Sequence, residues 1–281
     1  MIDNLSSGKK QNLKEALSKP NFKLIEGDIR DSNTLKHAFQ DVNAVIHLAA
    51  LIDVASSVTD PEATNEINVN GTLKVLREAA NCKVDRFVFA SSTAVYGDAK
   101  VLPITEETPL NPISPYAASK VAGEAYCRSF MNCFNLSTVI LRFFNVYGPR
   151  NENSPYSGVI TKFLRKALKD EILNIYGDGH QTRDFIHVSD IVAALISALE
   201  TQVSGETFNI CTGTQTSINE LVDVIRLALG KNLKAEHVSA RPGEILFSYG
   251  DPSKAAEKLN FKSKVSLREG IDWLLETQKS A

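Results

Sequence analysis

The sequence predicts an α/β fold built on a Rossmann-type, doubly wound parallel sheet, with a small C-terminal α/β lobe. Two features of the first half predict the sheet: short, nearly continuous apolar runs, and amphipathic segments that alternate with them. Runs of this kind are typical of parallel strands that helices cover on both faces. The alternation loosens after Val146, where Gly148-Pro149 begins a polar loop, and this change predicts the lobe.

The expected strands of the first half are the apolar runs at residues 22–26, 44–48, 87–90 and 138–144. Helices are expected from Asp31 or Ser32 to Phe39, from Pro61 to Asn81, where proline suits the first turn, and from Pro115 to Asn135. In the second half, helices alternate with short strands, and we expect them at 159–169, 190–199, 218–229 and 267–276. We therefore divide the chain into a Rossmann domain, 1–150, and a second region, 151–281, of which 172–210 partly returns to the first sheet.

Composition narrows the classes of partner. The 281 residues carry a net charge of -2, so no basic field recruits nucleic acid or a membrane surface. No apolar run approaches the roughly 20 residues that span a bilayer, and the N-terminus has no signal-peptide pattern, which favours a cytoplasmic protein. The four cysteines are scattered and are expected to be buried free thiols, and the five histidines do not cluster at metal-ligand spacing, so no metal site is expected.

Tyr116 and Lys120 are the first candidates for chemistry. On a helix, positions i and i+4 share one face. A tyrosine normally titrates near 10, and a nearby ammonium group favours the phenolate and lowers that pKa. The pair could then exchange a proton with a substrate hydroxyl, although a tyrosine and a lysine on the surface of any helix give the same pattern.

The surroundings of this pair favour the chemical interpretation. Ligands of open parallel sheets bind beyond the carboxyl ends of the strands. Ser91 and Ser92 end an apolar strand, and a hydroxyl there can bond the substrate oxygen that Tyr116 serves. Pro112 and Pro115 bracket the start of the helix and thereby fix the direction of Tyr116.

Five motifs together resemble the extended short-chain dehydrogenase/reductases, and within them most closely the UDP-glucose 4-epimerases. The resemblance covers essentially the whole chain in order. Its motifs are Ser91-Ser-Thr-Ala-Val-Tyr-Gly97, Pro115-Tyr-Ala-Ala-Ser-Lys120, Arg142-Phe-Phe-Asn-Val-Tyr-Gly-Pro149, Arg183-Asp-Phe-Ile-His-Val-Ser-Asp190 and Arg241-Pro-Gly-Glu244.

The resemblance implies NAD as cofactor, a UDP-sugar as substrate and a site for each. Ser92, Tyr116 and Lys120 would be the catalytic residues, with 1–150 binding NAD and 151–281 binding the nucleotide-sugar. The implied cofactor contacts are Asp3 and Asn4 at the ribose, where an acidic residue suits the two hydroxyls of NAD, Asp28 and Ile29 at the adenine, Leu48, Ala49 and Ala50 along the pyrophosphate, and Asn68, Ser91, Tyr116, Lys120 and Phe143. The implied substrate contacts are Ser92, Asn145, Val159, Tyr176, Arg183, Arg241 and Ser248, among which arginines suit a pyrophosphate.

The resemblance also implies an activity. The Tyr116 phenolate would remove the proton of the sugar 4′-hydroxyl, the hydride would pass to NAD, and its return to the other face would invert C4. Dehydratases of this family carry an Asp-Glu pair where Thr93-Ala94 stands here, which disfavours dehydration. A UDP-glucuronate epimerase or decarboxylase and a non-catalytic sugar-nucleotide-binding protein stay open as alternatives. At the position that gates the 2-substituent, Ser248 is small, so we expect N-acetylhexosamine forms to fit.

The family pattern also departs from this chain at one end. Relatives begin with a strand and a Gly-x-x-Gly-x-x-Gly turn, which holds the pyrophosphate, whereas Met1 here stands two residues before the acidic Asp3. We therefore expect an N-terminally truncated Rossmann domain whose neighbouring strands expose apolar surface. Two interpretations stay open: the natural protein carries the turn before Met1, or the protein lacks it and binds NAD poorly or not at all. The resemblance further implies a homodimer in which the helices at 61–81 and 115–135 form a four-helix bundle. Glu124 is expected to be structural or at that interface, and His187 to pack at a sheet edge.

Overall fold

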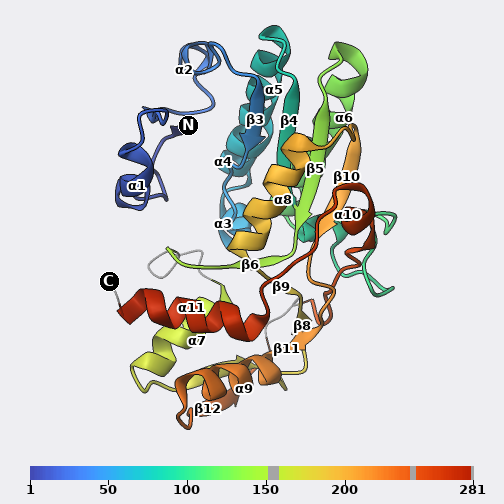
Figure 1. Cartoon of the computed structure of the whole chain (residues 1–281). Coiled ribbons are helices and arrows are strands. Elements are labelled where there is room, and N and C mark those ends of the chain that lie inside the picture. Colours follow the sequence, from blue (N-terminus) through green and yellow to red (C-terminus); the bar gives the residue numbers. More distant parts are fainter. Residues whose placement is uncertain (151–157, 241–244, 280–281) are drawn as a thin grey trace. The chain divides into compact units, whose positions relative to one another are not determined.

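The computed structural model describes residues 1–150, 158–240 and 245–279. It is a mixed α/β structure in two compact units, each discontinuous in sequence (Figure 1). The first unit comprises Met1–Val95, Pro112–Leu141 and Ala198–Thr207, and the second comprises Tyr96–Asn111, Arg142–Ser197 and Phe208–Ala281. The expected boundary at residue 150 stays a prediction, and Arg241 lies outside the described residues.

Strands and helices alternate through most of the described chain. The strands are β1 Ile2–Asp3, β2 Ile25–Glu26, β3 Ala44–His47, β4 Arg86–Ser92, β5 Thr138–Phe143, β6 Asn145–Tyr147, β7 Leu173–Tyr176, β8 Thr182–Arg183, β9 Phe185–His187, β10 Glu206–Ile210, β11 Thr216–Ser217 and β12 Ala235–Val238. The α-helices are α1 Lys14–Leu17, α2 Ser32–Ala38, α3 Val54–Thr59, α4 Pro61–Asn65, α5 Thr72–Asn81, α6 Pro115–Phe134, α7 Val159–Leu168, α8 Val188–Glu200, α9 Ile218–Leu229, α10 Ser253–Lys258 and α11 Leu267–Lys279. Among the described helices, none is both long and apolar enough to cross a bilayer.

The main sheet has four strands in the order β10-β5-β4-β3 (Figure 1). β3 and β4 run parallel, with Ala44 opposite Arg86 and His47 opposite Phe89. β1 and β2 form a separate parallel pair in which Ile2 lies opposite Ile25. The sheet is therefore a Rossmann-type parallel sheet, as expected.

The core of the first unit lies between the sheet and the helices α5 and α6. It is made of Val75, Leu76 and Ala79 of α5, Phe87 and Phe89 of β4, and Cys127 and Phe130 of α6. Each fully buried side chain of this size contributes about 1.5–3 kcal/mol through removal from water. This packing fixes α6 along β4, and these two elements carry the catalytic candidates.

The core of the second unit is assembled from α7, α9 and α11 with β7 and β9. Leu164, Leu173, Leu221, Ile225 and Ile271 are completely buried in it. β7 pairs in parallel with β12, and β6 pairs in parallel with β9. His187 of β9 packs its ring edge-on against Tyr147 and Trp273, at 5.3 and 5.2 Å between ring centroids, as its expected packing role requires.

Three local expectations need correction. The strand expected at 22–26 is only Ile25–Glu26, because its partner β1 offers two residues for pairing. The helix expected at 61–81 contains a π-helical segment, Glu66–Gly71, between α4 and α5. Of the four free cysteines, Cys127 and Cys211 are buried, but Cys82 and Cys133 are exposed.

Candidate active site

The start of α6 sets the direction of Tyr116. Ser114 has extended backbone and its hydroxyl accepts a hydrogen bond from the Ala117 amide at 3.1 Å, which satisfies one of the first helical N–H groups. Pro115 occupies the first helical position. The Tyr116 amide donates to Ser57 Oγ at 3.1 Å, so α3 also holds this end of the helix. α6 then ends on Asn135 in the left-handed conformation.

A close approach of α6 to β4 brings the catalytic candidates together. A Cβ at Gly123 would lie 2.4 Å from the Phe89 ring, so only glycine lets the helix lie this close. Lys120 Nζ donates to the carbonyl oxygen of Ala90 at 2.8 Å and lies 5.9 Å from the Tyr116 ring centroid. Tyr116 also shares a hydrogen bond with Ser92. All three catalytic candidates therefore belong to the first unit and meet where α6 crosses the end of β4.

Burial is the largest cause of the pKa shifts of Tyr116 and Lys120. Tyr116 and Lys120 are 8% and 5% exposed. Burial raises the pKa of Tyr116 above its usual value, and the hydrogen bond with Ser92 lowers it by less. Burial lowers the pKa of Lys120 to about 8, against the opposing effects of Cys127 and Glu124. The expectation that Lys120 lowers the tyrosine pKa therefore does not describe this ligand-free arrangement, in which burial disfavours the phenolate.

A buried carboxylate lies one helical turn beyond Lys120. Glu124 is 0% exposed, accepts a hydrogen bond from Ser91 Oγ at 2.6 Å and pairs with Arg128 at 3.1 Å. Because its side chain is buried within a single chain, it is not a dimer contact. In the sequence Glu124 looks like any charged helical residue, and only the tertiary packing shows that it belongs to the site.

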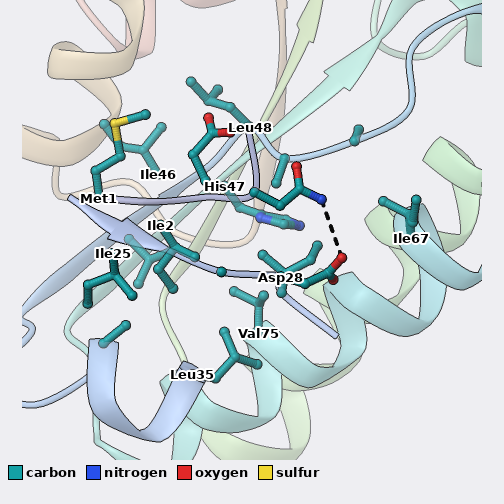
Figure 2. Close-up of a pocket in the computed structure, with 18 of the residues that line it drawn as sticks. Met1, Ile2, Ile25, Asp28, Leu35, Ile46, His47, Leu48, Ile67 and Val75 are labelled. Carbon is teal, nitrogen blue, oxygen red and sulfur yellow. Dashed lines mark hydrogen bonds between the residues drawn. The ribbon is translucent and has the colours of Figure 1, made fainter. Parts of the chain in front are cut away.

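A pocket of about 520 Å³ lies in the first unit, between β1 and β3. Seven of the residues expected to bind NAD line it: Asp3, Asn4, Asp28, Ile29, Leu48, Ala49 and Ala50. Figure 2 shows the aliphatic side chains of Ile2, Ile25, Leu35 and Val75 gathered around the cavity, with Asp28 at its polar end. Ile46 and Leu48, which also line the pocket, are 39% and 53% exposed.

The polar end of the pocket is held by short loops after β1 and β2. Asp3 Oδ1 accepts a hydrogen bond from the Leu5 amide at 2.7 Å. Asp28 binds the Arg30 side chain and accepts from Asn4 Nδ2 at 3.3 Å, the bond drawn in Figure 2. The Arg30 bond holds the Asp28 pKa at about 2, well below its usual value. The carboxylate of Asp3 therefore stands where an acceptor suits the ribose hydroxyls of a dinucleotide, and Asp28, expected at the adenine, is held by Arg30 and Asn4.

The other five residues expected to bind NAD are not among those that line this pocket: Asn68, Ser91, Tyr116, Lys120 and Phe143. The Asn68 side chain is buried, accepts from the Leu51 amide at 2.7 Å, and donates to the Leu51 carbonyl at 2.8 Å and to Ser119 Oγ at 3.0 Å. It therefore ties the segment after β3 to α6. The residue sits in the π-helical segment, a distortion frequent at functional sites.

His47 is a pocket residue that the sequence did not single out. Its ring bonds Thr72 Oγ1 at 2.9 Å, and burial lowers its pKa to about 3, so it is neutral. An alternating strand pattern cannot distinguish such a histidine from a core side chain. The signal that could have found it is its place as the last residue of β3.

The remaining substrate candidates belong to the second unit, as does Phe143, the last residue of β5. The Asn145 amide donates to the carbonyl oxygen of Asp184, the residue after Arg183, at 3.0 Å. Gln181 binds the Tyr176 carbonyl oxygen at 2.7 Å, and the Thr182 amide binds the Leu246 carbonyl oxygen at 2.7 Å, two residues before Ser248. Backbone and side-chain bonds thus bring together the segments that carry Asn145, Tyr176, Arg183 and Ser248, while Val159 begins α7.

Comparison with known proteins decides the family. Residues 1–274 match the sequence family described as GDP-mannose 4,6 dehydratase. The chain is 40% identical over its whole length to a putative UDP-glucose 4-epimerase of Methanocaldococcus jannaschii, of which it covers 90%. The chain belongs to the NAD-dependent epimerase/dehydratase family of extended short-chain dehydrogenase/reductases.

Two solved structures describe what relatives of this family bind. A UDP-N-acetylglucosamine 4-epimerase of Methanobrevibacter ruminantium, in complex with UDP-N-acetylmuramic acid, is 38% identical with a TM-score of 0.92, covering 98% of this chain and 90% of its own. A UDP-glucuronic acid 4-epimerase of Bacillus cereus, in complex with UDP-glucuronic acid and NAD, is 31% identical with a TM-score of 0.91, covering 99% and 90%.

The family makes this chain an enzyme of the nucleotide-sugar epimerase/dehydratase kind, with NAD as its cofactor. The chemistry of the residues that line the pocket suits that cofactor. Carboxylates stand at the polar end, and the small side chains of Ala49 and Ala50 leave backbone accessible along the wall. When bound, NAD supplies the hydride acceptor and donor of the reaction.

Proposed function

We propose that this enzyme inverts C4 of a UDP-sugar, as UDP-glucose 4-epimerases do, through a transient 4-keto sugar. The observation that carries the proposal is the meeting of Ser92, Tyr116 and Lys120 where α6 crosses the end of β4. A tyrosine phenolate with an ammonium group on the next helical turn could take the proton of a sugar hydroxyl when C4 is oxidised and return it when C4 is reduced.

Each catalytic side chain has a defined part in this proposal. Tyr116 takes the proton of the 4′-hydroxyl and returns it after inversion. Ser92 bonds the reacting oxygen, since its hydroxyl already shares a hydrogen bond with Tyr116. Lys120, held on the Ala90 carbonyl oxygen, would favour the phenolate by its charge and so oppose the burial that raises the Tyr116 pKa in the ligand-free protein.

The residues after Ser92 favour epimerisation over dehydration. Loss of water from a 4-keto sugar needs an acid and a base beside the C5–C6 bond, and Thr93 and Ala94 supply neither. The Ala94 amide donates to Ser92 Oγ at 3.2 Å, so this short turn orients the serine hydroxyl.

The second unit would bind the nucleotide-sugar. Arg183, with Arg241, suits a pyrophosphate because guanidinium groups donate paired hydrogen bonds. Asn145, Val159 and Tyr176 would complete this surface, and the small Ser248 would leave room for an N-acetyl group. The 38% identity to a UDP-N-acetylglucosamine 4-epimerase supports this choice of substrates.

The direct test is incubation of the purified chain, supplied with NAD, with UDP-glucose, UDP-N-acetylglucosamine and UDP-glucuronic acid in separate reactions. Proton NMR of the sugar ring would show the axial and equatorial C4 epimers. We expect UDP-glucose and UDP-N-acetylglucosamine each to be converted to its own C4 epimer. If only UDP-glucuronic acid is epimerised, the enzyme is a UDP-glucuronate epimerase. A 4-keto-6-deoxy product would indicate a dehydratase, and loss of carbon dioxide would indicate a decarboxylase. Binding without turnover would indicate a non-catalytic protein.

We also propose that the enzyme is a homodimer with a four-helix bundle, in which each chain supplies two helices: α6, and the continuous helix formed by α4, the π-helical segment and α5. The packing of α5 against α6 within the first unit supports it, because two adjacent helices form half of such a bundle. Sedimentation equilibrium would give twice the 30.8 kDa chain mass, and the monomer mass would contradict the proposal.

A further inference from the structure

We propose that Glu124 is a positioning residue for the reaction: its carboxylate holds Lys120 as an ammonium ion and anchors the end of β4 that carries Ser92. The inference rests on the proposed function for its kinetic consequences, but not for its structural basis. That basis is a row of residues on α6, Tyr116, Lys120 and Glu124, spaced four apart and therefore on one face.

The row meets three consecutive residues of β4. Lys120 Nζ donates to the Ala90 carbonyl oxygen at 2.8 Å, Ser91 Oγ donates to Glu124 at 2.6 Å, and Ser92 shares a hydrogen bond with Tyr116. Each residue at the end of β4 is thus bonded to one member of the row. A change at Glu124 would release the middle bond and loosen Ser92 next to it.

Glu124 is also the charge that balances Lys120. On β4, the Lys120 ammonium bonds the Ala90 carbonyl oxygen and lies 5.3 Å from the centroid of the Phe89 ring. The titratable groups around it are Cys127 and Glu124 on α6, His47 on β3, and Tyr116, whose ring centroid is 5.9 Å from Nζ. His47, whose pKa is lowered to about 3, is neutral, and burial raises the pKa values of Cys127 and Tyr116, so both are protonated. Among these titratable groups, Glu124 therefore supplies the negative charge that opposes the loss of the Lys120 proton, in addition to the Ala90 carbonyl oxygen and the Phe89 ring.

The Glu124 carboxylate is buried, and both of its oxygens are bonded to other side chains. Glu124 is 0% exposed, and its second oxygen pairs with Arg128, whose guanidinium also binds Thr207 Oγ1 at 3.2 Å. A buried carboxylate is costly unless its oxygens are bonded, and here both are. Three residues thus hold the carboxylate in the orientation that serves Lys120 and Ser91.

The test compares Glu124→Gln with the unchanged chain. The matched control is Glu62→Gln, which replaces an exposed glutamate on α4 with glutamine. Lys120 titration is followed by NMR of protein labelled with ¹⁵N-lysine, with Lys120→Arg to assign the signal. Glutamine keeps the shape and an acceptor for Ser91 but removes the charge. We expect the Lys120 titration to move to lower pH in Glu124→Gln and to stay unchanged in Glu62→Gln.

The same variants give the kinetic readout. Lys120 is charged below its pKa, so its contribution is lost as pH rises, and lowering that pKa moves the alkaline fall of kcat to lower pH. A shift of about one pH unit would lower kcat about threefold near pH 7.5 and about eightfold near pH 8.5, with little change near pH 6. A merely structural role would lower kcat equally at all three values.

The outcomes separate the two proposals. A shifted Lys120 titration without epimerase activity in any form of the chain supports the positioning role and overturns the proposed function. Epimerase activity with an unshifted Lys120 titration overturns the positioning role and leaves the proposed function intact. Should Glu124→Gln not fold, Ser91→Ala keeps the carboxylate beside Lys120, so we expect an unchanged titration with a lowered kcat. A lowered titration in Ser91→Ala would contradict the inference.

Discussion

The row of residues on α6 and the pocket beside β3 differ in how far they are exposed to solvent. Tyr116, Lys120 and Glu124 of the row are at most 8% exposed, and Lys120 and Glu124 are bonded to residues of β4. In the pocket, Asn4, Leu48 and Ala49 are exposed at the ends of short strands. The catalytic candidates are therefore held in the protein interior, whereas part of the pocket wall is open to solvent and accessible to a ligand.

Removal of the Tyr116 hydroxyl should have the largest effect on kcat. Tyr116→Phe deletes the proposed acid–base group, and such groups contribute about 10²–10⁴-fold to rate. We expect kcat for UDP-glucose to fall by that order while NAD binding, measured by isothermal calorimetry, persists. Retention of more than a tenth of the activity would show that another group handles the proton.

A change in the pocket should affect binding rather than chemistry. Asp3→Asn removes a charged acceptor proposed for the ribose, and hydrogen bonds to charged groups are worth about 1.5–3 kcal/mol, or roughly 10–100-fold in NAD affinity. At saturating NAD, kcat should be retained. An unchanged Kd for NAD would remove Asp3 from the cofactor site.

The close approach of α6 to β4 should be sensitive to a single methyl group. Gly123→Ala places a Cβ 2.4 Å from the Phe89 ring, and overpacking of this kind costs about 1–3 kcal/mol. Urea unfolding should show that loss. Gly158→Ala is the control, because no atom of the described residues lies within 4 Å of its added Cβ and its φ is -71°. Equal stability of both variants would mean that the helix has room to move.

The smallest expected effect concerns the substrate alone. Ser248→Tyr should lower kcat/KM for UDP-N-acetylglucosamine, since steric mismatch in a pocket is worth about 1–3 kcal/mol. The kcat/KM for UDP-glucose should change little. Equal losses for both sugars would show that Ser248 does not face the 2-substituent.

The sequence predicted the elements whose signals are local. The helix expected at 115–135 is found at Pro115–Phe134, because Ser114, Pro115 and Asn135 mark its two ends by their own chemistry. The pocket was also predictable in outline, since its residues follow strand ends. The short β2 was not, because the length of a strand depends on the partner with which it pairs.

Long-range contacts account for the rest. The π-helical segment is stabilised where Asn68 binds Leu51, 17 residues away, and where Gly71 meets Ile29. The role of Glu124 depends on Ser91, 33 residues earlier in the chain. The raised Tyr116 pKa was missed for the same reason, since burial by other segments outweighs the helical neighbour.

Transfer of deuterium at C4 tests the central claim most directly. UDP-glucose carrying deuterium at C4 is incubated with the enzyme and NAD in ordinary water, and the UDP-galactose product is examined by NMR and mass spectrometry. The row on α6 and β4 predicts that the product keeps its deuterium at C4, because the hydride leaves and returns within the site, and that Tyr116→Phe forms almost no product. Loss of the deuterium to solvent, or the absence of UDP-galactose, would contradict it.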